Sequence, residues 1–177
     1  MSEVIWLFGR CGAGKTTLAR LLVEALERRN RSVFLLDGDQ VRTGLSRDLG
    51  FSAGGREENH RRIAEVALLA AGQGILTVVA TMAPEERQRD LVRRVVGDRL
   101  LWVYVDTPIE ECIRRDPKGL YRRAAAGELG GLMEYPFEEP RSGEATVTVS
   151  TSGHTPEVCL GRLWAGLKGR LSLEDGG

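Results

Sequence analysis

Short runs of apolar residues alternate along this chain with longer stretches in which apolar residues recur every three or four positions. Continuous apolar runs are typical of buried strands, and the wider spacing is typical of helices. The predicted strands cover residues 4–8, 32–36, 75–80, 100–105 and 145–149. The predicted helices cover residues 16–29, 57–71, 84–96, 108–114 and 156–171. Strands and helices therefore alternate from one end of the chain to the other.

The predicted strands are apolar at successive positions instead of at every second one. Strands that are covered on both faces have this composition, so we expect a parallel sheet between two layers of helices. The chain of 177 residues suits one α/β domain with a single core. Ligands of such sheets bind beyond the carboxyl ends of the strands.

Residues 116–143 do not follow this pattern, because they combine five glycines and three prolines with clustered charge. The stretch is too long for a plain connection between two elements. We therefore predict a mobile lid over a site, in preference to a disordered linker. The last residues, 173–177, are expected to fray.

The most informative motif is GRCGAGKT over residues 9–16, a full G-x-x-x-x-G-K-[ST] between a predicted strand and a predicted helix. Glycines in this order let successive backbone N–H groups point at phosphate oxygens, and the start of the helix adds its positive end. Lys15 is expected to reach the β- and γ-phosphates, and the Thr16 hydroxyl to bind Mg²⁺. The motif predicts a P-loop NTPase fold, and the absence of an N-K-x-D tetrad counts against a GTPase.

A second candidate group, Asp37-Gly-Asp39, follows the second predicted strand. Two carboxylates facing the phosphate loop can hold Mg²⁺ through water and accept a proton from an attacking hydroxyl. The same residue types also form an Asp-Gly turn with a helix N-cap. Beside a phosphate loop, the functional interpretation is the favoured one.

Arg56, Asn59 and Arg62 are three residues apart and share one face at the start of a predicted helix. Their guanidinium and amide groups suit an anionic, polar ligand, and Phe51 offers a flat surface for a base. The alternative is a charged helix face in contact with solvent. His60 points away from this face and is expected on the surface.

Composition excludes several classes of protein. The chain carries 25 basic and 25 acidic side chains, which argues against a general nucleic-acid or membrane-surface binder. No apolar stretch is long enough to span a membrane, and three widely spaced cysteines form no disulfide framework, so we expect a cytoplasmic protein.

Only three basic residues are lysines, and Lys118 in the glycine-flanked lid is better explained by an anion than by packing.

Six motifs in order resemble the adenylylsulfate kinase (APS kinase) family. They are GxxGAGKTT, DGDxxRxGL, DLGFS, R-E-x-N-x-R-R, YVDTP and RDPKGLY, within residues 4–121. Members of that family transfer the γ-phosphate of ATP to the 3′-hydroxyl of adenosine 5′-phosphosulfate (APS), giving PAPS. The resemblance implies a kinase that uses ATP with Mg²⁺ and small-molecule substrates, and that forms a homodimer.

The resemblance also implies a role for each matching position. Asp39 would be the catalytic base, Lys15 would act on the transferred phosphoryl group, and Asp37 would support Mg²⁺ and its waters on the acceptor side. The residues implied around ATP are Gly12, Ala13, Gly14, Lys15, Thr16, Thr17 and, against the donor adenine, Arg115. The residues implied around the acceptor are Asp37, Arg42, Phe51, Arg56, Asn59, Lys118, Leu120 and Leu132.

Two stretches depart from the family pattern. The family's Ile-Ser-Pro-Phe/Tyr becomes Met82-Ala83-Pro84-Glu85, and this carboxylate would repel a phosphosulfate unless it turns outward or meets Arg87. In the lid, Leu132 replaces an aromatic residue, and Tyr135 or Phe137 could swing into its place. These departures leave two alternatives open, a related kinase for another nucleotide conjugate and a non-catalytic nucleotide-binding module.

Overall fold

The computed structural model describes residues 2–128 and 137–171, and its centre is a sheet of five parallel strands in the order β2-β3-β1-β4-β5. In the central register, Trp6 of β1 lies opposite Val79 of β3 and Trp102 of β4. The strands are β1 (Val4–Phe8), β2 (Val33–Asp37), β3 (Leu76–Ala80), β4 (Leu100–Asp106) and β5 (Val147–Ser150). The predicted parallel sheet is therefore confirmed.

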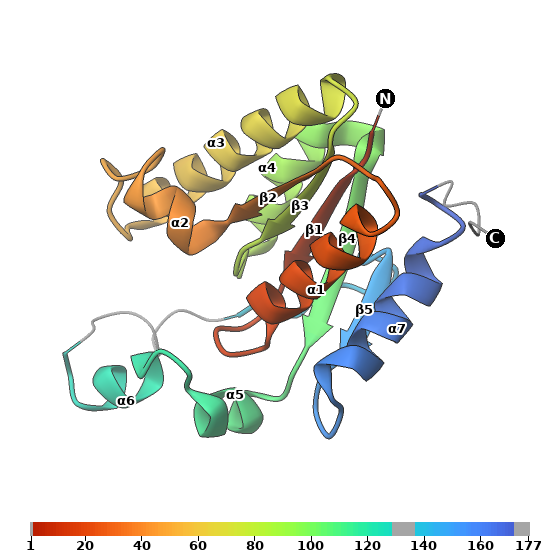
Figure 1. Cartoon of the computed structure of the whole chain (residues 1–177). Helices are drawn as coiled ribbons and strands as arrows, with labels where there is room; N and C mark the ends of the chain where they lie inside the picture. The colour runs from red at the N-terminus through yellow and green to blue at the C-terminus, as the bar shows by residue number, and fades with distance from the viewer. Residues whose placement is uncertain (1, 129–136, 172–177) are drawn as a thin grey trace.

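Helices cover both faces of this sheet, with α1 and α7 on one face and α3 and α4 on the other (Figure 1). The helices are α1 (Lys15–Glu27), α2 (Gly38–Thr43), α3 (Ala53–Gly72), α4 (Glu86–Val96), α5 (Ile109–Arg115), α6 (Leu120–Ala125) and α7 (Pro156–Leu167), with a 3₁₀ turn η1 (Gly97–Arg99). This arrangement confirms the three-layer α/β fold. The sequence pattern missed α2 and α6 because six residues are too few to show a helical period.

The start of α3 lies before the predicted one, because Ser52 caps the helix by accepting a hydrogen bond from the Gly55 amide at 3.2 Å. The cap draws two glycines into the first turn, although glycine is a weak helix former.

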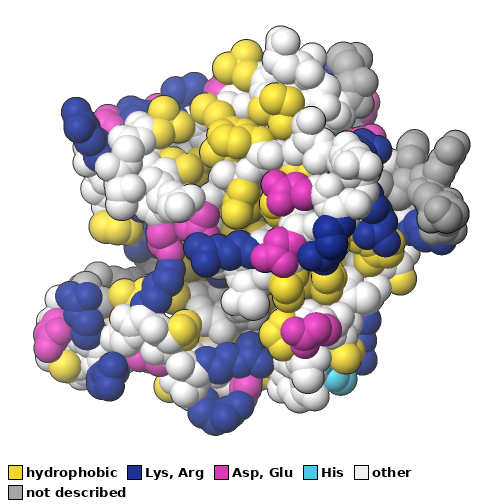
Figure 2. All heavy atoms as spheres, viewed as in Figure 1, with side chains coloured by type: hydrophobic (Ala, Val, Ile, Leu, Met, Phe, Trp, Pro, Cys, Tyr) yellow, Lys and Arg dark blue, Asp and Glu magenta, His cyan; other side chains and the backbone are white. Residues whose placement is uncertain are grey.

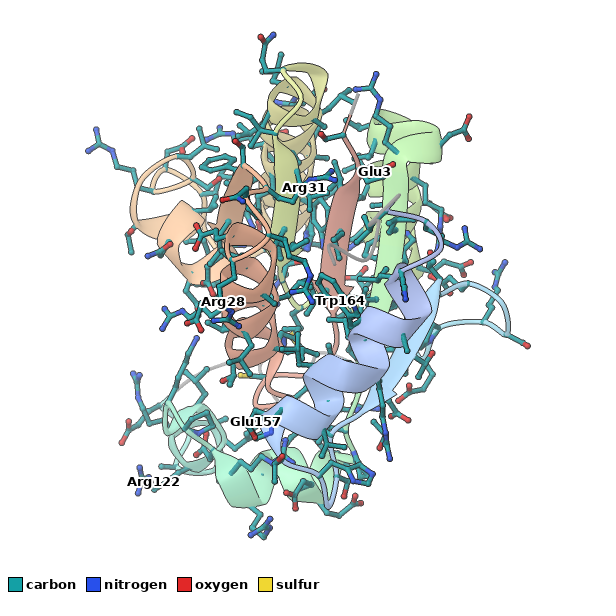
Figure 3. The ribbon with its side chains drawn as sticks, turned by 45° about the vertical axis from the view of Figure 1, so that its right-hand side comes forward. Glu3, Arg28, Arg31, Arg122, Glu157 and Trp164 are labelled. Carbon is teal, nitrogen blue, oxygen red and sulfur yellow. The ribbon has the colours of Figure 1, made fainter. Side chains whose placement is uncertain are left out.

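At the other end of the chain, Trp164 of α7 lies beside α1 (Figure 3). The Arg29 guanidinium carbon is 4.3 Å from the centroid of the Trp164 ring, which joins the turn after α1 to α7.

Alternate residues of the central strand enter two separate cores. Ile5 and Leu7 pack towards α1 and α7, whereas Trp6 and Phe8 pack towards α3 and α4, and all four are fully buried. Both faces of β1 are therefore apolar, which is why its sequence shows no alternation. The second core is rich in aromatic rings, with 4.8 Å between the centroids of Phe8 and Trp102.

His60 is buried, with 5% of its surface exposed, so the expectation of a surface histidine was wrong. Its ring stacks on Trp6, and its Nδ1 lies 2.8 Å from the Arg56 carbonyl oxygen. His60 belongs to the buried stripe of α3 that continues at Ile63, Ala64 and Ala67, at helical spacings of three, four and seven. Burial lowers the pKa of His60 to about 4.

Charges of both signs are interspersed over the face shown in Figure 2, which agrees with the balanced composition. Within residues 2–128 and 137–171, no helix is both long enough and apolar enough to cross a membrane.

Candidate active site

The carboxyl ends of the parallel strands meet at one edge of the sheet, and this edge carries the candidate site. Helices α5 and α6 lie beyond it (Figure 1), and the surface is hollowed between α2 and α6 (Figure 2). The phosphate loop follows β1, Asp37 ends β2 and Asp39 lies directly after it, and residues 81–85 follow β3. Motifs that are far apart in the sequence therefore face a common space.

The phosphate loop has the strand–loop–helix arrangement that its motif predicts. Gly9 has φ 151°, and a Cβ at this position would lie 2.5 Å from the carbonyl oxygen of Val105. Gly14, with φ 96°, is the N-cap of α1 and is followed directly by the helix. The loop therefore presents the amino end of α1 to the site, and Thr17 is exposed in its first turn.

Lys15 lies across the phosphate loop. Its Nζ donates hydrogen bonds to the carbonyl oxygens of Gly9, at 3.0 Å, and Arg10, at 2.7 Å. Loss of hydration lowers the pKa of the Lys15 ammonium to about 8. A phosphate in the loop would supply the negative charge that stabilises this cation.

Asp37 joins the phosphate loop to the acceptor side. Its Oδ2 accepts a 2.8 Å hydrogen bond from the Thr16 hydroxyl, and its Oδ1 accepts one of 2.9 Å from the Asp39 amide, which caps α2. The N-cap interpretation of this aspartate therefore holds in the structure, alongside the contact with Thr16. A hydroxyl and a carboxylate are oxygen ligands of the kind that Mg²⁺ prefers.

Mg²⁺ fits this pair without a dedicated cage. In the described part of the chain, no three His, Cys, Asp or Glu side chains are grouped so that they could hold a metal ion. Mg²⁺ at nucleotide sites keeps several waters and binds one or two protein ligands together with phosphate oxygens. Thr16 and Asp37 are sufficient for that mode.

Asp39 forms an ion pair with Lys118, which lies in the turn between α5 and α6. The two residues are 79 positions apart in the sequence, and the pair joins the first turn of α2 to the segment before α6. Both side chains are more than half exposed, so the pair contributes little stability and can be exchanged for contacts with a substrate. The structure thus brings the candidate base and the predicted anion-binding lysine together.

Two arginine guanidinium groups lie over the ring of Phe51. The guanidinium carbon of Arg42 is 4.5 Å from the Phe51 ring centroid, and that of Arg56 is 5.7 Å from it. Phe51 itself is 67% exposed. Burial and the neighbouring charge of Arg56 lower the pKa of Arg42. Two like charges beside an exposed ring form a site at which an anion joined to a flat base would relieve the repulsion.

Asn59 and Arg62 have different environments, although their spacing places them on one helix face. Asn59 is 4% exposed, and within the described residues its Oδ1 has no hydrogen-bond partner. Arg62 turns to Asp48, with Nη1 and Oδ1 2.7 Å apart, and to Glu58, with Nε and Oε1 3.0 Å apart. The expectation that Arg62 would face the ligand with Asn59 was wrong, because these carboxylates occupy its guanidinium.

The donor side contains residues to which the sequence assigned no role. Arg115 donates a 2.9 Å hydrogen bond to the Thr151 hydroxyl, and both Thr151 and Thr107 donate to the Ala13 carbonyl at 3.2 Å. Arg115 is therefore connected to the phosphate loop through the end of β5. Thr107 stands in the YVDTP motif, which was a signal that could have identified it.

Helix α6 also contacts the phosphate loop. Tyr121, which is buried, donates a 2.8 Å hydrogen bond from its hydroxyl to the Cys11 carbonyl. Leu120 begins α6 and is partly buried, and Gly12 lies against α5, where an added Cβ would be 3.0 Å from the Cys112 carbonyl oxygen. Tyr121 closes the RDPKGLY motif, so its position was visible in the sequence.

The structure shows the contacts of Glu85 and Phe137, which lie in the two stretches that depart from the family pattern. Glu85 forms an ion pair with Arg87 and accepts a 3.1 Å hydrogen bond from Gln88, so the expected partner does meet this carboxylate. Phe137 stacks on Tyr104 with 6.1 Å between ring centroids, so its ring is held at β4. Leu132 and Tyr135 lie outside the described residues.

The fold and the phosphate loop define a P-loop protein, and its relatives place it among the kinases, phosphotransferases that act on a hydroxyl group. The family model described as adenylylsulphate kinase matches residues 1–148. An adenylyl-sulfate kinase of Pseudomonas aeruginosa is 44% identical over 163 residues, which are 90% of this chain and 82% of the relative. The chain belongs to the adenylylsulfate kinase family, as its motifs predicted.

Solved structures agree with this assignment. A Mycobacterium tuberculosis APS kinase in complex with AMPPNP and APS matches with a TM-score of 0.88 and 35% identity, over 94% of this chain and 98% of that one. A hexameric APS kinase from Thiobacillus denitrificans matches with a TM-score of 0.73 and 27% identity, over 97% of this chain and 29% of that one. A shikimate kinase from Acinetobacter baumannii, at 23% identity and a TM-score of 0.60, shares the fold.

Proposed function

We propose that this chain transfers the γ-phosphate of ATP to the 3′-hydroxyl of APS, giving PAPS and ADP. The observation that carries the proposal is the presence, at one edge of the sheet, of a complete phosphate loop and an exposed Phe51 ring flanked by two arginines. The loop suits the triphosphate of the donor. The ring and the guanidinium groups suit an adenine and a phosphosulfate on the acceptor.

The phosphoryl-transfer roles follow from the positions of the side chains. The amide groups at the start of α1 and the Lys15 ammonium would bind the β- and γ-phosphates. Thr16 and Asp37 would hold Mg²⁺, which supplies charge neutralisation on the phosphates. Asp39 would accept the proton of the attacking hydroxyl, and Lys118 beside it would then be released to an anionic substrate oxygen.

The binding roles are those that the family resemblance implies. Phe51 would stack on the acceptor adenine, and Arg115 would lie against the donor adenine. The acceptor phosphosulfate would be bound by Arg42, Arg56 and Asn59, and the apolar cover would come from Leu120 and Leu132. An aromatic side chain that stacks on a base contributes about 1–3 kcal/mol to binding, so leucine at this position should weaken acceptor binding by up to that amount.

The remaining parts of the proposal concern the whole chain. We propose that residues 1–177 form one kinase domain and that residues 116–143 act as its lid. We also propose a homodimer acting in the cytoplasm. Light scattering on the purified protein tests the dimer, and a monomer or a hexamer would contradict it.

The first experiment measures ADP release from Mg·ATP with APS and with a panel of other nucleotides and nucleotide conjugates. Turnover on APS with formation of PAPS supports the proposal. Preference for another conjugate would favour a related kinase, a possibility motivated by the Ala83, Glu85 and Leu132 departures. ATP binding without turnover on any acceptor would favour the non-catalytic module.

Asp39→Asn tests the base directly. We expect kcat to fall by about 100-fold or more, because general-base catalysis contributes that much, while KM for ATP stays within about twofold. Asp98→Asn is the matched control, since Asp98 is an exposed aspartate in η1, before β4, at the opposite edge of the sheet. An unchanged kcat in Asp39→Asn would rule out the base assignment.

A further inference from the structure

Residues 137–145, here termed the return segment, lead into β5 and cross the site edge of the sheet. None of the six family motifs includes them. Three glutamates hold the segment to three different parts of the fold, namely Glu138, Glu139 and Glu144. The contacts of each glutamate indicate what the segment connects.

Glu139 attaches the segment to the phosphate loop. Its Oε1 lies 2.5 Å from Nη2 of Arg10, and its Oε2 accepts a hydrogen bond from the Tyr104 hydroxyl. The Arg10 guanidinium carbon is also 4.8 Å from the centroid of the Phe137 ring, which itself stacks on Tyr104. Arg10 occupies a variable position of the phosphate-loop motif, and its side chain turns to the return segment.

Glu138 attaches the same segment to the loop that follows β3. Its amide donates a 2.8 Å hydrogen bond to the Pro84 carbonyl, and its carboxylate accepts a 2.6 Å bond from the Glu86 amide. Because β1 lies between β3 and β4 in the sheet, the segment crosses from β4 over the phosphate loop to the β3 side. It therefore joins the donor side of the edge to the acceptor side.

Glu144 fixes the far end of the segment by buried charge. Its Oε1 lies 2.6 Å from Nε of Arg89 and 2.5 Å from Nη2 of Arg93, and its own side chain is 6% exposed. The Arg10–Glu139 pair is more open, with side chains 22% and 57% exposed. One end is thus held firmly, and the end at the phosphate loop is held by contacts that a substitution can release with little damage to the core.

We propose that Arg10 is a positioning residue for the acceptor side of the site. Through Glu139 it holds the return segment on the phosphate loop. Through Glu138 the segment fixes the loop at Pro84, which follows β3, the neighbour of the strand β2 that ends at Asp37. This inference rests on the proposed function, because that function defines the acceptor side. Lys15 bridges the carbonyls of Gly9 and Arg10, so the loop backbone keeps its own support when the Arg10 side chain is removed.

The kinetic test uses Arg10→Leu, Glu139→Gln and the double variant. We expect Arg10→Leu, which removes the ion pair and the ring contact with Phe137, to raise KM for APS by about 5- to 10-fold. Glu139→Gln removes the ion pair alone and should raise it by up to about 5-fold. KM for ATP and kcat should stay within about twofold in both. The double variant is expected to match Arg10→Leu, because the ion pair that Glu139→Gln removes is already lost in that variant. Arg10→Lys should recover part of the loss. Arg28→Leu, an exposed ion-pair arginine at the end of α1 (Figure 3), is the control.

Hydrogen exchange supplies a readout that needs no turnover. In Arg10→Leu we expect faster exchange in peptides covering residues 137–145 and unchanged exchange in peptides covering residues 9–16. Unchanged exchange in residues 137–145, or equal increases in KM for ATP and APS, would overturn the inference. A wild-type protein that makes no PAPS would overturn the proposed function instead, and the exchange comparison would still decide whether Arg10 positions the segment.

Discussion

The Thr16 hydroxyl donates a 2.8 Å hydrogen bond to Asp37 Oδ2 and so joins the first turn of α1 to the end of β2. The strand β3 lies between β1 and β2 in the sheet, so the contact forms beyond the sheet edge, where the chain leaves both strands. Two hard oxygen ligands thus stand beside the phosphate loop. This relationship supports the proposed role of Asp37 with Mg²⁺.

Asp37→Asn is expected to raise the Mg²⁺ concentration needed for half-maximal activity by about 10-fold or more, the size of effect that lost support around a metal site produces. The amide oxygen of asparagine can still cap α2, so the free energy of unfolding should fall by less than about 1 kcal/mol. Mg²⁺ titrations at fixed ATP measure the first quantity and urea unfolding the second. An unchanged Mg²⁺ requirement would contradict the assignment.

The lowered pKa of Lys15, about 8, predicts that ATP affinity falls as the pH rises above 8. Bound ATP is a polyanion, so it stabilises the protonated amine and raises the pKa of Lys15 in the complex. At a pH between the pKa of the free protein and that of the complex, Lys15 must take up a proton when ATP binds. Over that range the Kd for ATP rises by about tenfold per pH unit. Calorimetric titrations from pH 7.5 to 9.5 measure it, and Lys15→Arg, whose cation persists, should show a flatter profile. A constant Kd in the wild type would refute the prediction.

Buried His60 predicts loss of stability in acid. Its pKa is about 4 in the folded protein and about 6.5 in an unfolded chain, so the unfolded state binds more protons between these values. The stability that neutral His60 contributes is therefore present above pH 6.5 and is lost as the pH falls towards 4, by up to about 3 kcal/mol.

His60→Phe removes this titration and keeps a ring against Trp6. Urea unfolding at pH 7 and pH 4.5 should show a smaller drop in the free energy of unfolding for this variant than for the wild type. His154→Phe is the control, because His154 is exposed. Equal drops in all three proteins would contradict the prediction.

Glu144→Gln is expected to destabilise the protein by about 3–5 kcal/mol, because it leaves the buried Arg89 guanidinium without its carboxylate. Arg89 is 1% exposed and also donates hydrogen bonds to the carbonyls of Ala83 and Pro84, so it cannot turn to solvent. Denaturant unfolding measures the loss. Glu24→Gln, in an exposed pair with Arg28, should change stability by less than about 0.5 kcal/mol, and a similar loss in both variants would disprove the prediction.

The sequence by itself determined the parallel α/β fold, the phosphate loop and the family. These features are local, because a helical period, an apolar strand or a motif such as GRCGAGKT lies within one continuous stretch of chain. The six-residue helices α2 and α6 are too short to be predicted from periodicity. The side chain of Asp37 caps α2, and that of Asp116 accepts hydrogen bonds from the Tyr121 and Arg122 amides in the first turn of α6. Most of the candidate site residues could be named from the sequence because they stand in the same ordered motifs, and their roles remain predictions.

The tertiary structure alone decided how side chains of distant segments pair. It buried His60 against Trp6, turned Arg62 to Asp48 and held Phe137 on Tyr104. It also paired Asp39 with Lys118 across 79 residues and Arg10 with Glu139 across 129. Such contacts depend on which helix face packs on the sheet and on which partner a long side chain reaches. Neither is a property of any one stretch of sequence, so both are set only when the layers assemble.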